Sequence, residues 1–338
     1  MAYITLNKNH FFHNLDIITN RTKTKDKIAL VLKDNAYGHG LLEIAKLAKE
    51  YGITKCVVKS EAEAEIAEPF FEYILVLADF PLSYSKKRRY TINDINAISR
   101  FAKGTKVELK VDTGMHRNGI APHELYEAFK KIEAQGLRLE AVFTHHRSAD
   151  ELSSEWFWQN DIFKTLKKES QKYAEEFAFD TLRFHSANSA SLFRSEEFSE
   201  DMARVGIVAY GCMELASGLQ SEEFKPVLSL YASKISSREL KVGERVGYGA
   251  TYEANESEVV SNYDIGYGDG FLREFSNSYI TPDGVKIVGR VSMDNSSFLT
   301  DKREILIYKS ALEASKVLKT ISYELLTSLK SDIKRTIV

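Results

Sequence analysis

The chain has 338 residues, of which 43% are hydrophobic and 28% charged, and its formal net charge is -2. This length allows one large α/β domain with a smaller second domain, and the composition excludes extensive disorder. Because there is no excess of basic residues to hold a phosphate backbone, nucleic acid is excluded as a partner.

The N-terminal segment and the cysteines indicate the cellular compartment of the protein. Residues 1–8 lack a basic stretch followed by an apolar core, and no apolar run is long enough to span a membrane. Cys56 and Cys212 are too few and too far apart for a disulfide framework. We therefore expect a cytoplasmic protein without membrane contact, in which both thiols are reduced and buried.

Up to about residue 222, short β-branched runs alternate with longer helical patterns, which is typical of parallel βα units. The predicted strands are 28–32, 55–58, 73–78, 89–92, 106–111, 139–144, 181–185 and 204–209. The predicted helices are 41–51, 95–103, 123–133 and 155–177. Gly52 follows the first of these helices, at a position where glycine favours a helix end. Eight strands in this alternation predict a closed barrel.

After Pro226 the pattern changes to short β-like runs joined by Asn, Gly and Pro-Asp-Gly turns. These runs are 227–235, 247–252, 258–263, 279–291 and 304–308, and a helix at 312–318 and the segment 323–338 follow them. We predict an α/β fold with a (β/α)8 TIM-type barrel over residues 8–222. A mainly antiparallel, β-rich C-terminal domain would cover residues 223–338, with residues 1–7 as a candidate to pair with it.

Lys33 ends the first apolar strand and opens the motif KDNAYGHG, residues 33–40. Barrel enzymes hold their chemistry at the C-terminal ends of the strands. An amine at the edge of an apolar core loses hydration and is more easily deprotonated, as a Schiff-base lysine requires. Lys33 is therefore the leading candidate for covalent catalysis, and the alternative is a solvated lysine that caps a strand.

Other polar residues also lie at predicted strand ends, namely Lys110, His145, His185 and Arg204. A purely structural barrel has little reason to gather two histidines, two lysines and an arginine at one rim. Ser189 supplies a hydroxyl for a phosphate near a helix start, and Gly206 lets the backbone approach that phosphate closely. The alternative for Ser189 is a helix N-cap. We predict no metal site.

The motif KDNAYGHG resembles the cofactor-lysine signature of bacterial alanine racemases, which use pyridoxal 5′-phosphate (PLP). Further matching strings, in the family's order, are KVDTGMHRNG (110–119), THHRSAD (144–150), HSANSA (185–190), RVGI (204–207), YGATY (248–252), IGYGDG (265–270) and GRVSMD (289–294). The resemblance covers about residues 30–325. It implies a PLP enzyme that racemises L- and D-alanine, as a homodimer with shared active sites, and supplies D-alanine for peptidoglycan.

The resemblance implies two bases on opposite faces of the substrate, Lys33 and the Tyr248 of a partner subunit. It implies cofactor contacts from Lys33, Tyr37, His145, Ser189, Arg204, Gly206, Ile207 and Tyr323. It implies substrate contacts from Arg117, Tyr267 and Met293. Lys110 matches a lysine that is often carbamylated in the family, and the alternative is an unmodified Lys110 in a salt bridge.

By this resemblance, Arg204 would donate a hydrogen bond to the pyridine nitrogen of the cofactor. Because a guanidinium keeps its proton, that nitrogen would stay unprotonated, which favours racemisation over transamination. The ordinary pKa of tyrosine, near 10, is too high for a base at neutral pH. Cationic neighbours must lower the pKa of Tyr248, and Arg204 acting through His145 is a candidate route. The alternative for Tyr248 is a cross-strand aromatic in a hairpin.

His146 and Arg147 stand where the family usually has an aromatic and a small residue, so they would alter the potential near an anionic cofactor. Ser292 replaces a frequent cysteine, and the segment 294–304 is shorter than usual. The alternatives within enzymes are a broader racemase acting on serine or another small amino acid, and a decarboxylase, which Tyr248 and Arg204 argue against. A non-catalytic PLP carrier is the alternative of another class, although such proteins lack the second domain.

Overall fold

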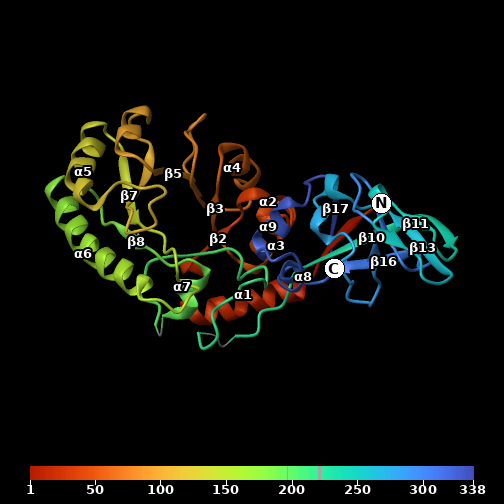
Figure 1. Ribbon diagram of the computed structural model, residues 1–338. Coiled ribbons are helices and arrows are strands. Elements are labelled where there is room, and N and C mark those ends of the chain that lie inside the picture. Colours follow the sequence, from red (N-terminus) through yellow and green to blue (C-terminus); the bar gives the residue numbers. More distant parts are fainter. Residues whose placement is uncertain (196, 220–221) are drawn as a thin grey trace.

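The computed structural model describes residues 1–195, 197–219 and 222–338 (Figure 1). Eight parallel strands form one sheet, and the barrel predicted from the sequence is confirmed. In neighbour order they are β8 (Arg183–His185), β7 (Arg138–Phe143), β6 (Lys106–Lys110), β5 (Arg88–Ile92), β4 (Tyr73–Val76), β3 (Lys55–Val58), β2 (Ile28–Val31) and β9 (Ala203–Val205). The strands are rich in buried aliphatic residues, as parallel strands covered on both faces must be.

The barrel is nearly closed, because β8 and β9 are not paired as regular strands. Two backbone hydrogen bonds cross that gap, from Arg204 N–H to Ala187 O at 2.9 Å and from Asp201 N–H to Phe184 O at 3.2 Å. The predicted strand 204–209 is too long, since β9 ends at Val205. The chain turns there with Gly206, whose carbonyl accepts from Ala209 N–H at 2.9 Å.

Helices surround the barrel, with α5 and α6 on its outer side (Figure 1). They are α1 (Lys8–Thr22), α3 (Leu41–Tyr51), α4 (Glu61–Ala67), α5 (Leu125–Ala134), α6 (Glu155–Glu176) and α7 (Ser189–Arg194). Gly52 ends α3 in the left-handed conformation with φ 98°, as its position predicts. The predicted helix 95–103 is wrong, because this segment forms only the 3-10 turn η2 (Ile95–Arg100).

The second sheet has seven strands and is mainly antiparallel. They are β1 (Tyr3–Leu6), β10 (Leu228–Leu240), β13 (Glu258–Tyr263), β14 (Ile287–Val288), β15 (Ser296–Phe298), β16 (Glu304–Tyr308) and β17 (Lys334–Ile337). β1 pairs antiparallel with β10 and parallel with β17, so strands from both ends of the chain lie side by side. Further elements are the small pair β11 (Arg245–Val246) and β12 (Tyr252–Glu253) and the helices α8 (Ala311–Leu318) and α9 (Ser322–Ser328).

Two predicted strands of this region are wrong. Half of 247–252 is the 3-10 turn η4 (Tyr248–Ala250), because Gly247 and Gly249 take positive φ values of 70° and 73° that interrupt a strand. Within 279–291 only Ile287–Val288 is a strand, because Pro-Asp-Gly forms a turn in which Gly284 N–H donates to Thr281 O at 2.9 Å.

Both cysteines are buried free thiols, as predicted. None of the helices in the described residues is long and apolar enough to cross a membrane. Most buried apolar side chains of the barrel and of the second sheet belong to one continuous cluster, and a separate small cluster in the second domain consists of Leu240, Val246, Ala254, Val260 and Val288. The two parts therefore share a packed boundary.

Candidate active site

Lys33 directly follows β2 at the C-terminal end of the barrel. Its side chain is 35% exposed, and its Nζ lies 3.5 Å from the Asp34 carboxylate and 5.9 Å from the centre of the Tyr37 ring. The sequence predicts a dehydrated amine, whereas in the single chain this amine is partly exposed. The chain turns out of the barrel at this point, which leaves the amine at the opening beside a carboxylate.

The segment after Lys33, labelled α2 (Lys33–Tyr37), is a left-handed turn. Residues 34–37 have φ between 51° and 55°, a conformation that costs about 1–2 kcal/mol for each residue with a Cβ. Hydrogen bonds offset part of this cost: the Glu63 carboxylate accepts from Asp34 N–H at 2.6 Å, and Asn35 Oδ1 accepts from Leu41 N–H at 2.8 Å. The turn therefore fixes Lys33 and Tyr37 at the rim at the expense of backbone strain.

Arg204 is the middle residue of β9, and it is 6% exposed. Its Nη1 donates to both Nδ1 and O of His185, and its Nη2 donates to Thr144 O at 2.6 Å and to Ser186 O at 3.2 Å. Among the described residues, no partner accepts from Nε–H. Burial lowers the pKa of Arg204 to about 10, so the guanidinium stays charged at neutral pH with one donor unused.

A buried polar network supports Arg204 from inside the barrel. Because the guanidinium can only donate, His185 Nδ1 must accept, and Nε2–H must donate to Glu108 at 2.9 Å. Glu108 also accepts from the Tyr73 hydroxyl and from Arg183 at 2.9 Å. Although burial opposes it, the hydrogen bond from His185, then the Arg183 charge, lower the pKa of Glu108 to about 2. The network holds His185 in one tautomer.

Lys110 and His145 lie among the same charges. Burial, followed by the charges of Arg117 and Arg204, lowers the pKa of Lys110 to about 8. Burial, then the charges of Arg204, Lys110 and Arg117, lowers the pKa of His145 well below its usual range. No ion pair involves Lys110 in the described part of the chain, so its predicted alternative, an ordinary salt bridge, is wrong. The rim therefore holds a neutral imidazole and a readily deprotonated lysine.

Ser189 is the first residue of α7 and is 7% exposed. Asn188 is the N-cap, because its side chain accepts from Ser191 N–H at 2.9 Å, so the alternative interpretation of Ser189 as the cap is wrong. The Ser189 hydroxyl accepts from Gly206 N–H at 3.1 Å. No acceptor for the hydroxyl proton lies in residues 1–195, 197–219 or 222–338, so this proton is free to donate to an anion.

Two tyrosines cover the Ser189 and Gly206 side of the rim. The Tyr37 and Tyr323 ring centres lie 5.7 Å apart, although the two residues come from opposite ends of the chain. A Cβ on Gly206 would lie 2.9 Å from the Tyr37 hydroxyl, so only glycine leaves room there. Ile207 follows and is buried. Burial raises the pKa of both phenols, which keeps them protonated as donors.

Tyr248, Tyr267 and Met293 lie in the second domain and are 69%, 45% and 55% exposed. Tyr267 and Met293 are neighbours, because Tyr267 N–H donates to Ser292 O at 3.0 Å and the next residue donates to Met293 O at 2.8 Å. Within one chain these side chains are not gathered with the barrel rim. Their exposure leaves these side chains available to contact another surface.

The donor set of the rim fits an anionic aldehyde cofactor such as PLP. Lys33, Lys110, Arg117 and Arg204 bring positive charge together, while the Asp112 carboxylate is taken by backbone N–H groups. The Ser189 hydroxyl and the space at Gly206 form a cradle for a phosphate. Lys33 supplies a primary amine that can bond to an aldehyde.

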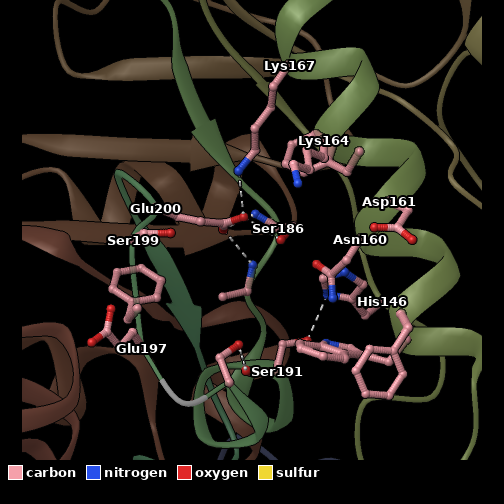
Figure 2. Close-up of a pocket in the computed structure, with 16 residues that line it drawn as sticks. His146, Asn160, Asp161, Lys164, Lys167, Ser186, Ser191, Glu197, Ser199 and Glu200 are labelled. Carbon is pink, nitrogen blue, oxygen red and sulfur yellow. Dashed lines mark hydrogen bonds and ion pairs between the residues drawn. The ribbon is translucent and has the colours of Figure 1, made fainter.

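A cavity of roughly 420 Å³ lies away from this rim, between α6 and the segments around β8 and α7 (Figure 2). Its lining includes His146, Lys167 and Glu200, and the last two form an ion pair at 3.1 Å. His146 is 3% exposed and bonds the Ser191 hydroxyl through Nδ1 at 2.8 Å. The His146 side chain therefore belongs to the outer layer, and none of the predicted site residues lines the cavity.

Two family models match the chain: the alanine racemase N-terminal domain over residues 6–214 and the alanine racemase C-terminal domain over residues 227–337. The alanine racemase of a Nitratiruptor species is 46% identical over 336 residues, which is 99% of each chain. That of Campylobacter curvus is 41% identical over 340 residues and 100% of each chain. This chain belongs to the alanine racemase family. It is accordingly an isomerase of the amino-acid racemase type, from a family that depends on PLP.

Solved structures of racemases share the fold along the whole chain. An alanine racemase from Bacillus anthracis with bound L-Ala-P has a TM-score of 0.89 at 26% identity, covering 100% of this chain and 95% of that one. A histidine racemase from Leuconostoc mesenteroides has a TM-score of 0.85 at 26% identity, covering 100% and 98%. The racemase fold is therefore not tied to one amino-acid side chain.

The sequence-based interpretation missed Glu108, Arg183 and Gln159. Glu108 and Arg183 each lie two residues before a predicted rim residue of the same strand, so both pairs point to the same side. That spacing was a usable signal. Gln159 gave no signal, because one polar residue near the start of a long helix normally faces solvent. Here it is 2% exposed and bonds Thr113 Oγ1 and His145 O, each at 3.2 Å.

Proposed function

We propose that this racemase interconverts L- and D-alanine with PLP, using Lys33 of one subunit and Tyr248 of its partner as bases. The observation that carries the proposal is Arg204, a buried and charged guanidinium whose Nη hydrogens are all bonded to the protein. Its remaining Nε–H would donate to the pyridine nitrogen and leave that nitrogen unprotonated. D-Alanine formed in this way would serve peptidoglycan.

The chemistry that PLP supplies when bound is acidification of the α-C–H bond of an attached amino acid. Inversion at this carbon needs a proton acceptor on one face and a proton donor on the other. In the L-to-D direction the partner's Tyr248 would remove the proton and Lys33 would return one, and the roles would be reversed for D-alanine. The large exposure of Tyr248 supports a homodimer with shared sites.

The remaining residues would bind and orient. Arg117 would hold the substrate carboxylate, while Tyr267 and Met293 of the partner would form the substrate entrance. The neutral His145 imidazole would lie against the cofactor ring without adding charge. Phosphate contacts would come from Tyr37, Ser189, Gly206, Ile207 and Tyr323. A carbamylated Lys110 would supply an anion that orients Arg117.

A second candidate is a racemase with another preferred side chain. It is favoured by the histidine racemase from Leuconostoc mesenteroides, which is as similar in sequence to this chain as the Bacillus anthracis alanine racemase is. A PLP carrier without turnover is disfavoured, because both family models match and the second domain is present.

Chiral chromatography of L-alanine, L-serine and other L-amino acids incubated with the PLP-loaded protein tests these hypotheses. We expect D-alanine to form fastest and to disappear with Lys33→Ala. Lys59→Ala is the matched control, because Lys59 contacts the same Asp34 carboxylate at 3.4 Å but follows β3 instead of β2 and is not one of the proposed catalytic or binding residues. Preference for another amino acid would select the second candidate, and no D-product at all would contradict both.

A further inference from the structure

We propose that Arg147 is a positioning residue that holds the loop carrying Arg117 in place for the substrate carboxylate. The inference rests on the proposed function, because it takes Arg117 as the carboxylate-binding group. The family resemblance gives a small residue at the position of Arg147, and a small side chain could not span from this strand end to the neighbouring loop. We call the contacts of Arg147 with Gly114 and Glu155 the clamp, and this clamp is thus a feature of this chain.

The Arg147 side chain joins two elements. Its Nη1 donates to Gly114 O at 2.6 Å, and its Nη2 forms an ion pair with Glu155 at the start of α6. Gly114 lies in the loop after β6, three residues before Arg117. The guanidinium therefore ties the Arg117 loop to the first turn of α6. Its contacts in the described residues include none of the predicted site residues, so it acts through geometry.

Arg147 is itself fixed by a buried group. Its backbone N–H donates to Gln159 Oε1 at 3.0 Å, and Gln159 Nε2 donates to Thr113 Oγ1 at 3.2 Å. Gln159 is 2% exposed and thus has little freedom to move. The Thr113 hydroxyl also bonds the Thr144 hydroxyl at 2.8 Å. These contacts hold the loops after β6 and β7 in a fixed position relative to each other.

The loop after β6 has hydrogen bonds of its own, and the contact of Arg147 with Gly114 O adds to them. Asp112 Oδ1 accepts from Gly114 N–H at 2.8 Å and from His116 N–H at 3.1 Å, so residues 112–116 form a compact turn. The Arg117 guanidinium makes no hydrogen bond or ion pair within the described ranges, so its position depends strongly on the backbone that carries it, whether or not a carbamylated Lys110 adds a contact. Movement of Gly114 would therefore move Arg117.

A surface role alone does not explain this arrangement. Arg147 and Glu155 are 37% and 28% exposed, and ion pairs at such exposure add little to stability. A general stability effect and a substrate-binding effect can therefore be separated. Loss of one hydrogen bond from a charged donor corresponds to about a tenfold or larger change in an equilibrium constant.

Kinetics of L-alanine racemisation by the PLP-loaded enzyme test the proposal in three variants. We expect Arg147→Gln to raise KM by about tenfold while kcat and PLP affinity change little. Arg147→Lys keeps the charge but lacks the two-sided fork, so it should resemble Arg147→Gln. Arg138→Gln, which removes an exposed arginine at the opposite end of β7, is the control and should match wild type.

Hydrogen exchange of the amides in 112–118 gives a readout that does not depend on activity. We expect faster exchange there in Arg147→Gln and wild-type exchange in Arg138→Gln. Unchanged exchange and KM in Arg147→Gln, or full rescue by Arg147→Lys, would overturn the clamp. Failure of wild type to racemise alanine would instead refute the proposed function, while the exchange result would still decide whether the loop is held by Arg147.

Discussion

The single residue with the clearest dependence on pH is Glu108. Its pKa in the folded protein is about 2, below the ordinary value of 4.5, so the unfolded chain binds more protons between these pH values. Folding stability from Glu108 is therefore complete above about pH 4.5 and is lost as pH falls toward 2. The shift corresponds to about 3 kcal/mol, because one pKa unit is worth about 1.4 kcal/mol.

Glu108→Gln tests this dependence. The amide keeps the shape but removes the charge between His185 and Arg183, so the variant should lose about 3 kcal/mol at pH 7. Urea unfolding at pH 7 and at pH 3 measures the effect. The difference from wild type should shrink at the lower pH, and an equal difference at both pH values would show that charge is not the cause.

Lys110 provides a prediction about covalent modification. A neutral amine reacts with carbon dioxide, and the pKa of Lys110, lowered to about 8, makes the neutral form accessible near physiological pH. In 13C-bicarbonate, NMR should show a carbamate signal that grows as pH rises toward and past 8. Lys110→Arg is the control and should lack this signal. Spectra that do not differ between wild type and Lys110→Arg would rule out carbamylation of this residue.

Among the elements, the left-handed turn after β2 concentrates strain beside the proposed catalytic lysine. Asn35 contributes in two ways, since asparagine tolerates this conformation better than most residues and its side chain accepts from Leu41 N–H at the start of α3. Asn35→Ala should therefore destabilise the protein by about 1–2 kcal/mol. Asn35→Asp retains both properties and should stay close to wild type. Thermal unfolding of the two variants distinguishes these effects.

Elements in the barrel were predicted well because each strand is a compact buried run. β2 is buried at all of its positions, and its sequence has no competing interpretation. The partners of Arg204 could not be predicted, since they depend on how β8 and β9 approach across the incomplete closure. The strand 279–291 was overextended because β-branched residues flank a turn, and β15 was missed because two of its three residues are serines.

At the scale of the whole molecule, the open question is whether each active site takes residues from two subunits. If the partner's Tyr248 completes the site at Lys33, a Lys33→Ala chain and a Tyr248→Phe chain can form one intact site in a mixed dimer. We expect each variant to be nearly inactive and an exchanged mixture to recover up to about a quarter of wild-type turnover, by random pairing. Turnover is followed by formation of D-alanine.

Subunit exchange is verified with differently tagged chains, and a mixture of either variant with itself is the control. Absence of recovery after proven exchange would place both bases in one chain. Recovery without any dimer in solution would also contradict the proposed arrangement.

The pairing of β1 with both β10 and β17 also constrains how the chain folds during its synthesis on the ribosome. Tyr3 lies opposite Tyr231 and beside Lys334, so the earliest described strand finds its neighbours only after nearly all the rest has been made. Most barrel strands pair with near neighbours in sequence, β2 with β9 being the exception, whereas β1 must wait for both of its neighbours with open backbone groups. Early termination of synthesis would therefore leave a strand edge exposed to aggregation, and a circular permutant joining the two ends would relieve that delay.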